Sequence, residues 1–433
     1  MGTVVRSYLE HSTRSSFFEH TLISLESLNE ESKQLLKSIN CTSSENAFFE
    51  PEGLIDLIAK SDVVLVHWWN HPLLQYFLMK TDLPPCRLVF WSHISGTPAP
   101  NNFCRFILEY PDRFIFTTPL SYFVPEVNEI SSYQKRNFGC IWSTAGVERL
   151  MRFDQDKSTE DLLDVSYVGN LDYTKVHKDF LALCVDLIES GNRVNVVGPT
   201  TEEFLRDLKN VQINQRPTIY GYVDEKTKFE LLASSKIFGY PLARHNYATC
   251  DQSLQEALFF GAVPVVLNNP MESYMVRHGV TGLVARNSRE YLTFVKSLVS
   301  DGTEYKRLRH NAKSFARKVY SIASLAEEWE SEFRAMLKLE KQKRYCLEKM
   351  CGKELKPSDV FLESLGHQAA LFKYHSDAVT DEALSIAEAQ LRCLSSLPQW
   401  SSFTKSTPSH FAQNFSPDPL LRRWSELTRS QAN

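Results

Sequence analysis

Short apolar runs alternate with amphipathic stretches through the middle of the chain. The runs at residues 165–168, 194–197, 237–240 and 262–267 are almost wholly apolar, as in strands buried on both faces of a parallel sheet. Residues 180–188 place apolar side chains at helical spacing before Gly191, and this pattern predicts a helix. Further helices are predicted over residues 201–208, 224–234, 251–260 and 324–338. The alternation predicts a doubly wound α/β domain over residues 164–340, with its ligand at the carboxyl ends of the strands.

The first 140 residues show the same pattern less clearly. Apolar runs at residues 62–67, 87–93 and 113–118 predict buried strands, so we expect a second Rossmann-like domain over residues 1–140. Residues 141–163 are expected to be a linker. Beyond residue 340 the chain is first highly charged, then predicts an amphipathic helix over 381–397, and becomes rich in Ser and Pro over 401–419. We therefore expect a helical and irregular C-terminal extension over residues 341–433.

Composition narrows the classes of function. The 433 residues include 48 Lys and Arg against 52 Asp and Glu, and this formal net charge of −4 argues against a nucleic-acid partner. No apolar run is long enough to span a membrane, and the N-terminal residues are too polar for a signal peptide. The nine cysteines form no CxxC pair and no cluster with metal-ligand spacing. We expect a cytoplasmic protein with reduced thiols and no metal. Peripheral membrane contact stays open, although we expect no basic amphipathic helix to support it.

Residues 245–267 carry the most informative pattern. They read as a polar loop, a helix start, a short helix that Gly261 ends, and a buried strand. A helix N-terminus at the edge of a parallel sheet presents free N–H groups and a positive partial charge, which suit a phosphate. The alternative is ordinary helix capping, because Thr249 with Gln252 and Ser253 with Glu256 each fit a capping box.

Five short motifs between Asp164 and Leu337 occur in an order that resembles the nucleotide-binding domain of family 4 glycosyltransferases. They are Val168-Gly-Asn-Leu with Lys175, Gly221-Tyr-Val-Asp, Glu256-Ala followed by Gly261-Ala-Val-Pro-Val-Val, Glu272, and Gly279-Val-Thr-Gly-Leu-Val. Each motif is weak alone, but together they cover about 170 residues. The resemblance implies a GT-B fold, in which two Rossmann-like doubly wound domains face a cleft, and a retaining sugar transfer.

The resemblance also implies roles for individual residues. Lys175 would hold the diphosphate of a nucleotide sugar, and Glu256 would accept hydrogen bonds from the ribose hydroxyls. The expected donor-binding residues are Gly169, Asn170, Lys175, Gly221, Tyr222, Thr249, Cys250, Asp251, Gln252 and Glu256. The resemblance implies no metal and no cofactor besides the donor itself, because Lys175 and helix-end amides would stabilise the leaving diphosphate.

This chain departs from the family pattern at three positions. Ala248 stands where the family has its first motif glutamate, Asp251 where it has a phosphate-side glycine, and Asn170 where it has an arginine. The sequence is similar to the branch of the family that reads G-T-x-[DE]-Q in this loop. We expect Asp251 to face the sugar hydroxyls, because an anion beside a diphosphate would be unfavourable.

In the N-terminal half, His93 follows a predicted strand and resembles the family histidine that reaches the transferred sugar, so we expect a catalytic role for it. His67 resembles a second family position of structural character. The alternative for both is a hydrogen-bonded scaffold residue. The paired-glycine loop that opens family members has no counterpart here, because Gly2 is the only glycine before Gly53. We expect that loop to be absent, shortened or lost, together with the first strand.

Taken together, the sequence predicts a retaining, metal-independent, hexosyltransferase-like glycosyltransferase. Its partners would be a UDP- or GDP-linked sugar and an acceptor that the sequence does not identify. Two alternatives stay open. One is a GT-B scaffold that has lost turnover and acts as a binding or partner subunit, for which Ala248, Asn170 and the missing glycine loop are the evidence. The other is a GT-B phosphorylase or epimerase, which the motif around Glu256 disfavours.

Overall fold

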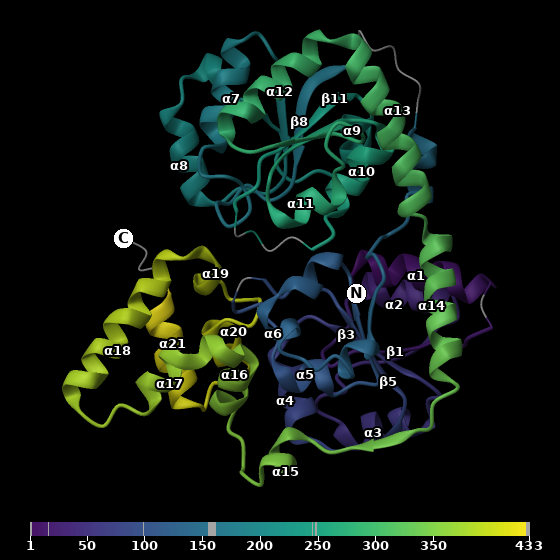
Figure 1. Ribbon diagram of the computed structural model, residues 1–433, viewed down its shortest axis with the longest axis vertical. Helices are drawn as coiled ribbons and strands as arrows, with labels where there is room; N and C mark the ends of the chain where they lie inside the picture. The colour runs from purple at the N-terminus through teal and green to yellow at the C-terminus, as the bar shows by residue number, and fades with distance from the viewer. Residues whose placement is uncertain are drawn as a thin grey trace. The chain divides into compact units, whose positions relative to one another are not determined.

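The computed structural model describes residues 2–15, 17–97, 99–154, 162–244, 246 and 249–429. Contacts divide the chain into two compact units. The first contains Leu9–Ile141 and the chain from Glu327 onward, and the second contains Trp142–Ala326 with Thr3–Tyr8. Two helices, α1 (Thr3–Ser15) and α14 (Ile322–Met336), include residues of both units. Figure 1 labels most of the helices and some of the strands of each unit.

The second unit is built on a six-stranded parallel sheet in the order β10-β9-β8-β11-β12-β13. Its strands are β8 (Leu163–Val168), β9 (Val194–Val197), β10 (Thr218–Ile219), β11 (Ser235–Tyr240), β12 (Val263–Leu267) and β13 (Leu283–Ala285). Every residue of β9 and β12 is buried, because helices cover both faces of the sheet. The predicted doubly wound domain is confirmed.

The helices of this unit fall into two layers (Figure 1). They are α7 (Phe180–Glu189), α8 (Glu202–Asn210), α9 (Glu225–Ala233), α10 (Gln252–Phe260), α11 (Pro270–Met275), α12 (Ser288–Ser300) and α13 (Gly302–Val319). On one face α12 packs against α7, β11 and β12, and on the other α9, α10 and α13 pack together against β8, β11 and β12. The helix α10 ends at Gly261, whose φ of 73° is the left-handed conformation that a glycine adopts at this position without steric cost.

Three helices of the second unit, α11, α12 and α13, are absent from the elements predicted above. On α13 the buried positions are Tyr305, Leu308, Ala312 and Ala316, and its other face carries many Lys and Arg residues. Two small alanines make a weak apolar stripe, so the periodicity of this segment is hard to detect. The helix α13 is basic and amphipathic, but its apolar face is buried within the unit, so the expectation that no such helix supports membrane contact stays a prediction.

The first unit contains a four-stranded parallel sheet in the order β3-β5-β6-β7 and two small two-stranded sheets, parallel β1-β2 and antiparallel β14-β4. Its strands are β1 (Thr21–Ile23), β2 (Thr42–Ser44), β3 (Val64–Trp68), β4 (Leu83–Cys86), β5 (Leu88–Ser92), β6 (Arg113–Phe116), β7 (Phe138–Cys140) and β14 (Gln342–Arg344). Its N-terminal helices are α2 (Glu30–Ser38), α3 (Pro51–Lys60), α4 (Pro72–Lys80), α5 (Arg105–Glu109) and α6 (Pro125–Asn128). All five residues of β5 are buried, as expected for a central strand of a sheet covered on both faces.

The C-terminal region consists mainly of helices that belong to the first unit. They are α15 (Leu347–Cys351), α16 (Pro357–Leu365), α17 (Ala370–Ser376), α18 (Asp381–Cys393), α19 (Pro398–Ser401), α20 (Pro408–Asn414) and α21 (Pro419–Thr428). The helices α15, α16 and α20 contact α4. Phe361, Phe411 and Trp424 lie in the same hydrophobic cluster as Phe90 and Phe114 of the sheet. The expected extension is therefore helical and shares the core of the first unit.

The expected linker is packed over its described residues. Ser143 accepts a hydrogen bond from Gln255 through its backbone carbonyl at 2.8 Å, and Thr144 Oγ1 donates to the carbonyl of Tyr320 at 3.2 Å. The carboxylate of Glu148 accepts hydrogen bonds from the backbone N–H of Ile322. Trp142–Asp154 is thus part of the second unit. No helix in the described part of the chain is long and apolar enough to cross a bilayer.

Candidate functional site

The strands β8 and β11 are adjacent at the centre of the sheet of the second unit, and the chain continues from them toward opposite edges of the sheet. The chain passes from β8 to β9 and β10 on one side, and from β11 to β12 and β13 on the other. Doubly wound sheets bind their ligands in the crevice at such a switch point, outside the carboxyl ends of the strands. Lys175 follows β8 and Asp251 follows β11, and the carbonyl of Lys175 accepts a hydrogen bond from Ala243 at 2.8 Å. Lys175 and Asp251 therefore meet at this edge.

Lys175, Asp251 and Tyr240 form a buried polar group at this edge. The Lys175 ammonium lies 3.0 Å from Asp251 Oδ2, and the Tyr240 hydroxyl donates to the same oxygen at 2.6 Å. Only 9% of the Lys175 side chain and 15% of the Asp251 side chain are exposed. Burial, with the charge of Asp251 adding to it, raises the pKa of Tyr240 well above its ordinary value, so the phenol stays a proton donor.

Glu272 on α11 is a buried carboxyl group that the sequence marked only as a motif match. Its Oε1 accepts hydrogen bonds from the side-chain amides of Asn246, at 3.1 Å, and Asn269, at 3.3 Å. Its Oε2 has no hydrogen-bond partner among the described residues. Burial raises the pKa of Glu272 to about 7, and the nearby charge of Asp251 adds to the shift. Burial therefore favours the protonated, neutral form of this carboxyl group.

Glu256 is almost completely buried on α10 and is bound by two cations. Its carboxylate lies 2.5 Å from Arg149 Nη2 and 3.0 Å from Lys228 Nζ. The capping interpretation of this residue is wrong, because the N-cap position of α10 is Asp251 and Glu256 lies in the second helical turn. The sequence did not point to Arg149 or Lys228, which come from the segment before β8 and from α9. A ribose at this position would have to share the carboxylate with both cations.

Three glycines bring the backbone at the ends of β8 and β9 close together. A Cβ atom on Gly198, whose φ is 144°, would lie 1.9 Å from the carbonyl oxygen of Gly169. The N–H of Gly198 donates to the carbonyl of Gly221 at 2.8 Å. Next to them, the carbonyl of Asn170 accepts a hydrogen bond from the hydroxyl of Tyr167 at 2.9 Å. Backbone packing alone therefore explains why the residue at Gly198 is a glycine, whether or not a ligand binds nearby.

The other predicted donor residues lie around the start of α10 and after β10. Cys250 is buried, and its sulfur accepts a hydrogen bond from Gln255 Nε2 at 3.1 Å. Thr249 and Gln252 are partly buried, and the Tyr222 side chain is 88% exposed. Ala248, where the family glutamate is missing, lies outside the described residues.

The two predicted histidines lie in the first unit, at the carboxyl ends of β3 and β5. His67 Nδ1 and His93 Nε2 are 2.9 Å apart, and the exposed indole of Trp69 stacks on the His93 ring at 4.6 Å. Burial lowers the pKa of His93 well below its ordinary value and that of His67 to about 4. Both imidazoles are therefore neutral at physiological pH and share one proton between the facing nitrogens. That His93 reaches the sugar stays a prediction.

Known proteins resemble the second unit in sequence and the chain in fold. Residues 151–315 match the family described as glycosyl transferases group 1. The structure of Alr3699/HepE from Anabaena in complex with UDP and glucose aligns with a TM-score of 0.57 at 11% identity, covering 77% of this chain and 96% of that one. A glycosyltransferase from Rickettsia africae ESF-5 aligns with a TM-score of 0.57 at 11% identity, over 78% and 94% of the two chains.

A third solved structure extends the comparison. The catalytic domain of starch synthase IV from Arabidopsis thaliana, bound to ADP and acarbose, aligns with a TM-score of 0.51 at 10% identity, over 72% of this chain and 79% of that one. A search of curated proteins finds no significant sequence match. The chain has the GT-B fold, with a helical C-terminal region added to it. Within the described part of the chain no group of three His, Cys, Asp or Glu residues is arranged to hold a metal ion.

Proposed function

We propose that this protein is a glycosyltransferase that takes a sugar from a nucleoside-diphosphate sugar bound to the second unit. The observation that carries the proposal is the position of Lys175. Its ammonium group lies at the switch point of the sheet, beside the N-terminus of α10. A cation and a helix N-terminus together stabilise a diphosphate, and most strongly when negative charge grows on it as the sugar bond breaks.

In the proposed reaction, the bond between the anomeric carbon and the donor phosphate oxygen breaks. An acceptor oxygen bonds to the same carbon, and the acceptor proton leaves with the diphosphate. Lys175 and the amides of α10 would stabilise the leaving group, so we propose that no divalent metal is needed. The resemblance of the donor motifs supports retention of anomeric configuration and a UDP- or GDP-linked hexose. His93 would contact the transferred sugar, and the first unit would bind the acceptor.

A second candidate function is nucleotide-sugar binding without turnover. It is favoured by the ion pair between Lys175 and Asp251, which neutralises the one cation of the phosphate site that the motifs predict. Asn170 adds to this argument because it replaces a second cation. A charged hydrogen bond of this kind is worth about 1.5–3 kcal/mol.

The purified full chain should be tested by calorimetry for binding of UDP, GDP and ADP, and by nucleotide release from their glucose, galactose, mannose and N-acetylglucosamine conjugates. We expect tight binding of one nucleotide and its release from one donor when a cell extract supplies acceptors. NMR of the product should show the anomeric configuration of the donor, and excess EDTA should leave the rate unchanged. Binding without release in any combination would favour the second candidate.

Lys175→Gln gives the sharpest test of the site. Its nucleotide affinity should fall by about tenfold to a hundredfold, because one charged hydrogen bond is lost. The matched control is Lys178→Gln, since Lys178 is exposed in the same loop. Equal nucleotide affinity in the two variants would contradict both candidate functions.

A further inference from the structure

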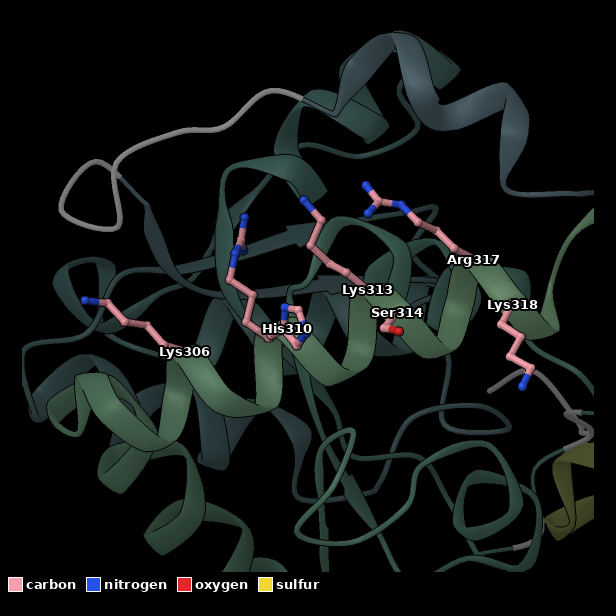
Figure 2. A pocket seen from close by; sticks show the side chains of 7 residues that line it. Lys306, His310, Lys313, Ser314, Arg317 and Lys318 are labelled. Atoms are coloured by element: carbon pink, nitrogen blue, oxygen red, sulfur yellow. The ribbon is translucent and has the colours of Figure 1, made fainter.

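A row of basic side chains on α13 borders a hollow of about 760 Å³ (Figure 2). The residues that line it, which we call the basic trough, are Lys306, Arg309, His310, Lys313, Ser314, Arg317 and Lys318. Its volume lies in the range of about 300–1,000 Å³ that is typical of small-molecule sites. None of these residues belongs to the proposed donor site.

The helix geometry explains why these charges lie in one row. Lys306, His310, Lys313 and Arg317 are spaced by three or four residues, so they share one face of α13 (Figure 2). At about 1.5 Å of rise per residue, Lys306 and Lys318 lie about 18 Å apart along the helix axis. The opposite face, with Leu308 and others, is buried, and α13 packs against α10. The packing of α13 therefore holds the basic face in a fixed position.

The positive charge of the basic trough is only partly balanced. Asp154 binds both Lys313, at 2.8 Å, and Arg317, at 2.5 Å. Arg309 donates to the carbonyl of Gly261 and to the hydroxyl of Tyr305, both neutral groups, at 3.0 Å. Lys306, His310 and Lys318 make no side-chain hydrogen bond or ion pair with the described residues. Among the described residues, Asp154 is thus the carboxylate that pairs with the trough, and it binds two of its five Lys and Arg side chains.

We propose that the basic trough binds a ligand that carries several phosphate groups. Phosphate oxygens accept charge-assisted hydrogen bonds from Lys and Arg, and the Ser314 hydroxyl offers a further donor in the same hollow. One phosphate contacts only two or three of these side chains, so a ligand with several phosphates fits the length of the row. The source is either a soluble polyphosphorylated molecule or a phosphoinositide headgroup. Both present the same chemistry to the protein.

The test is calorimetric titration of the full chain with inorganic tripolyphosphate and with inositol hexakisphosphate, at low and at physiological salt. We expect binding that weakens with salt. In the variant Lys306→Gln/His310→Gln/Lys318→Gln, Kd should rise by at least about tenfold, because charged hydrogen bonds are lost. Arg289→Gln/Lys296→Gln is the matched control, since both side chains are exposed on α12 outside the trough. Its Kd should stay unchanged.

A second arm distinguishes the two sources of phosphate. Vesicles of phosphatidylcholine with phosphatidylinositol bisphosphate are sedimented with the protein, beside vesicles of phosphatidylcholine alone. Trough-dependent binding to the phosphoinositide vesicles but not to the free polyphosphates identifies a headgroup as the ligand. Binding to the free polyphosphates alone identifies a soluble ligand. Circular dichroism confirms that each variant is folded.

Two results would overturn the proposal. The first is equal affinity of the triple variant and the wild type for the probes in both arms. The second is binding that Lys175→Gln abolishes and the triple variant does not, which places the polyphosphate in the donor site.

Discussion

The Lys175 ammonium lies 3.0 Å from the Asp251 carboxylate, although 76 residues separate them in the sequence. The two residues follow β8 and β11, which are neighbours in the sheet. In the structure Asp251 therefore forms an ion pair with Lys175, the cation that the donor motifs assign to a diphosphate. An incoming diphosphate has to displace this carboxylate or share the cation with it.

Asp251→Asn should separate the effect of Asp251 on nucleotide affinity from its effect on sugar transfer. We expect UDP or another bound nucleoside diphosphate to bind about tenfold more tightly, because Lys175 no longer has an anionic partner. The rate of sugar transfer should fall, since the proposed contact of Asp251 with the sugar hydroxyls is weakened. Calorimetry and nucleotide release measure the two quantities. Asp186→Asn, at an exposed position of α7, is the control. Tighter nucleotide binding with unchanged turnover would show that Asp251 has no role toward the sugar.

Glu256→Ala should destabilise the second unit by about 3–5 kcal/mol. It leaves Arg149 and Lys228 without their shared partner in a site where the carboxylate is only 3% exposed. Urea unfolding followed by circular dichroism gives the free energy of unfolding. Glu225→Ala removes only the more exposed partner of Arg149, at 3.3 Å, and should cost less than about 1 kcal/mol. Similar losses in both variants would mean that Glu256 contributes no more than a surface ion pair.

The buried carboxyl group of Glu272 predicts a pH dependence of stability. Its pKa of about 7 in the folded protein exceeds the ordinary value of 4.5, so the folded state binds a proton that the unfolded state releases between these values. The contribution of this group is therefore greatest below about pH 4.5 and is lost as pH rises through about 7. The loss amounts to roughly 3 kcal/mol.

The variant Glu272→Gln isolates this contribution from all other titrating groups. Urea unfolding at about pH 5 and about pH 8 gives the free energy of unfolding for both proteins. The wild type should lose more stability between these pH values than the variant does. An equal pH dependence in the two proteins would mean that Glu272 titrates normally.

Trp424→Ala tests whether the C-terminal helices are part of the core of the first unit. Trp424 is fully buried between Phe361 and Phe372, and its indole N–H donates to His375 Nδ1 at 3.1 Å. We expect a loss of about 3–5 kcal/mol, measured by urea unfolding of the full chain. Phe403→Ala is the control, because that ring is 48% exposed. Unchanged stability in Trp424→Ala would make the C-terminal helices an independently folded addition.

Much of the fold could be predicted from the order of apolar runs. In the second unit the strands are short and apolar, and glycines or capping residues end most of the elements between them, so local pattern and tertiary structure agree. Asp224 shows this, because the pattern predicts a helix that begins at this residue, and its side chain accepts the capping hydrogen bond from the N–H of Thr227. The helix α13 was missed because its buried side includes Ala312 and Ala316, which give little apolar signal.

The sequence alone determined the doubly wound class of the second unit, the motif positions of Lys175 and Glu256, and the loop that leads into α10. Only the tertiary structure decided which charges meet. Asp251 binds Lys175, and Arg149 binds Glu256 across 107 residues of sequence, because strand order brings distant loops to one edge of the sheet. Periodicity records which face of an element is buried, but not which side chain lies opposite a buried charge. The electrostatics of the proposed site therefore depend on contacts between distant segments.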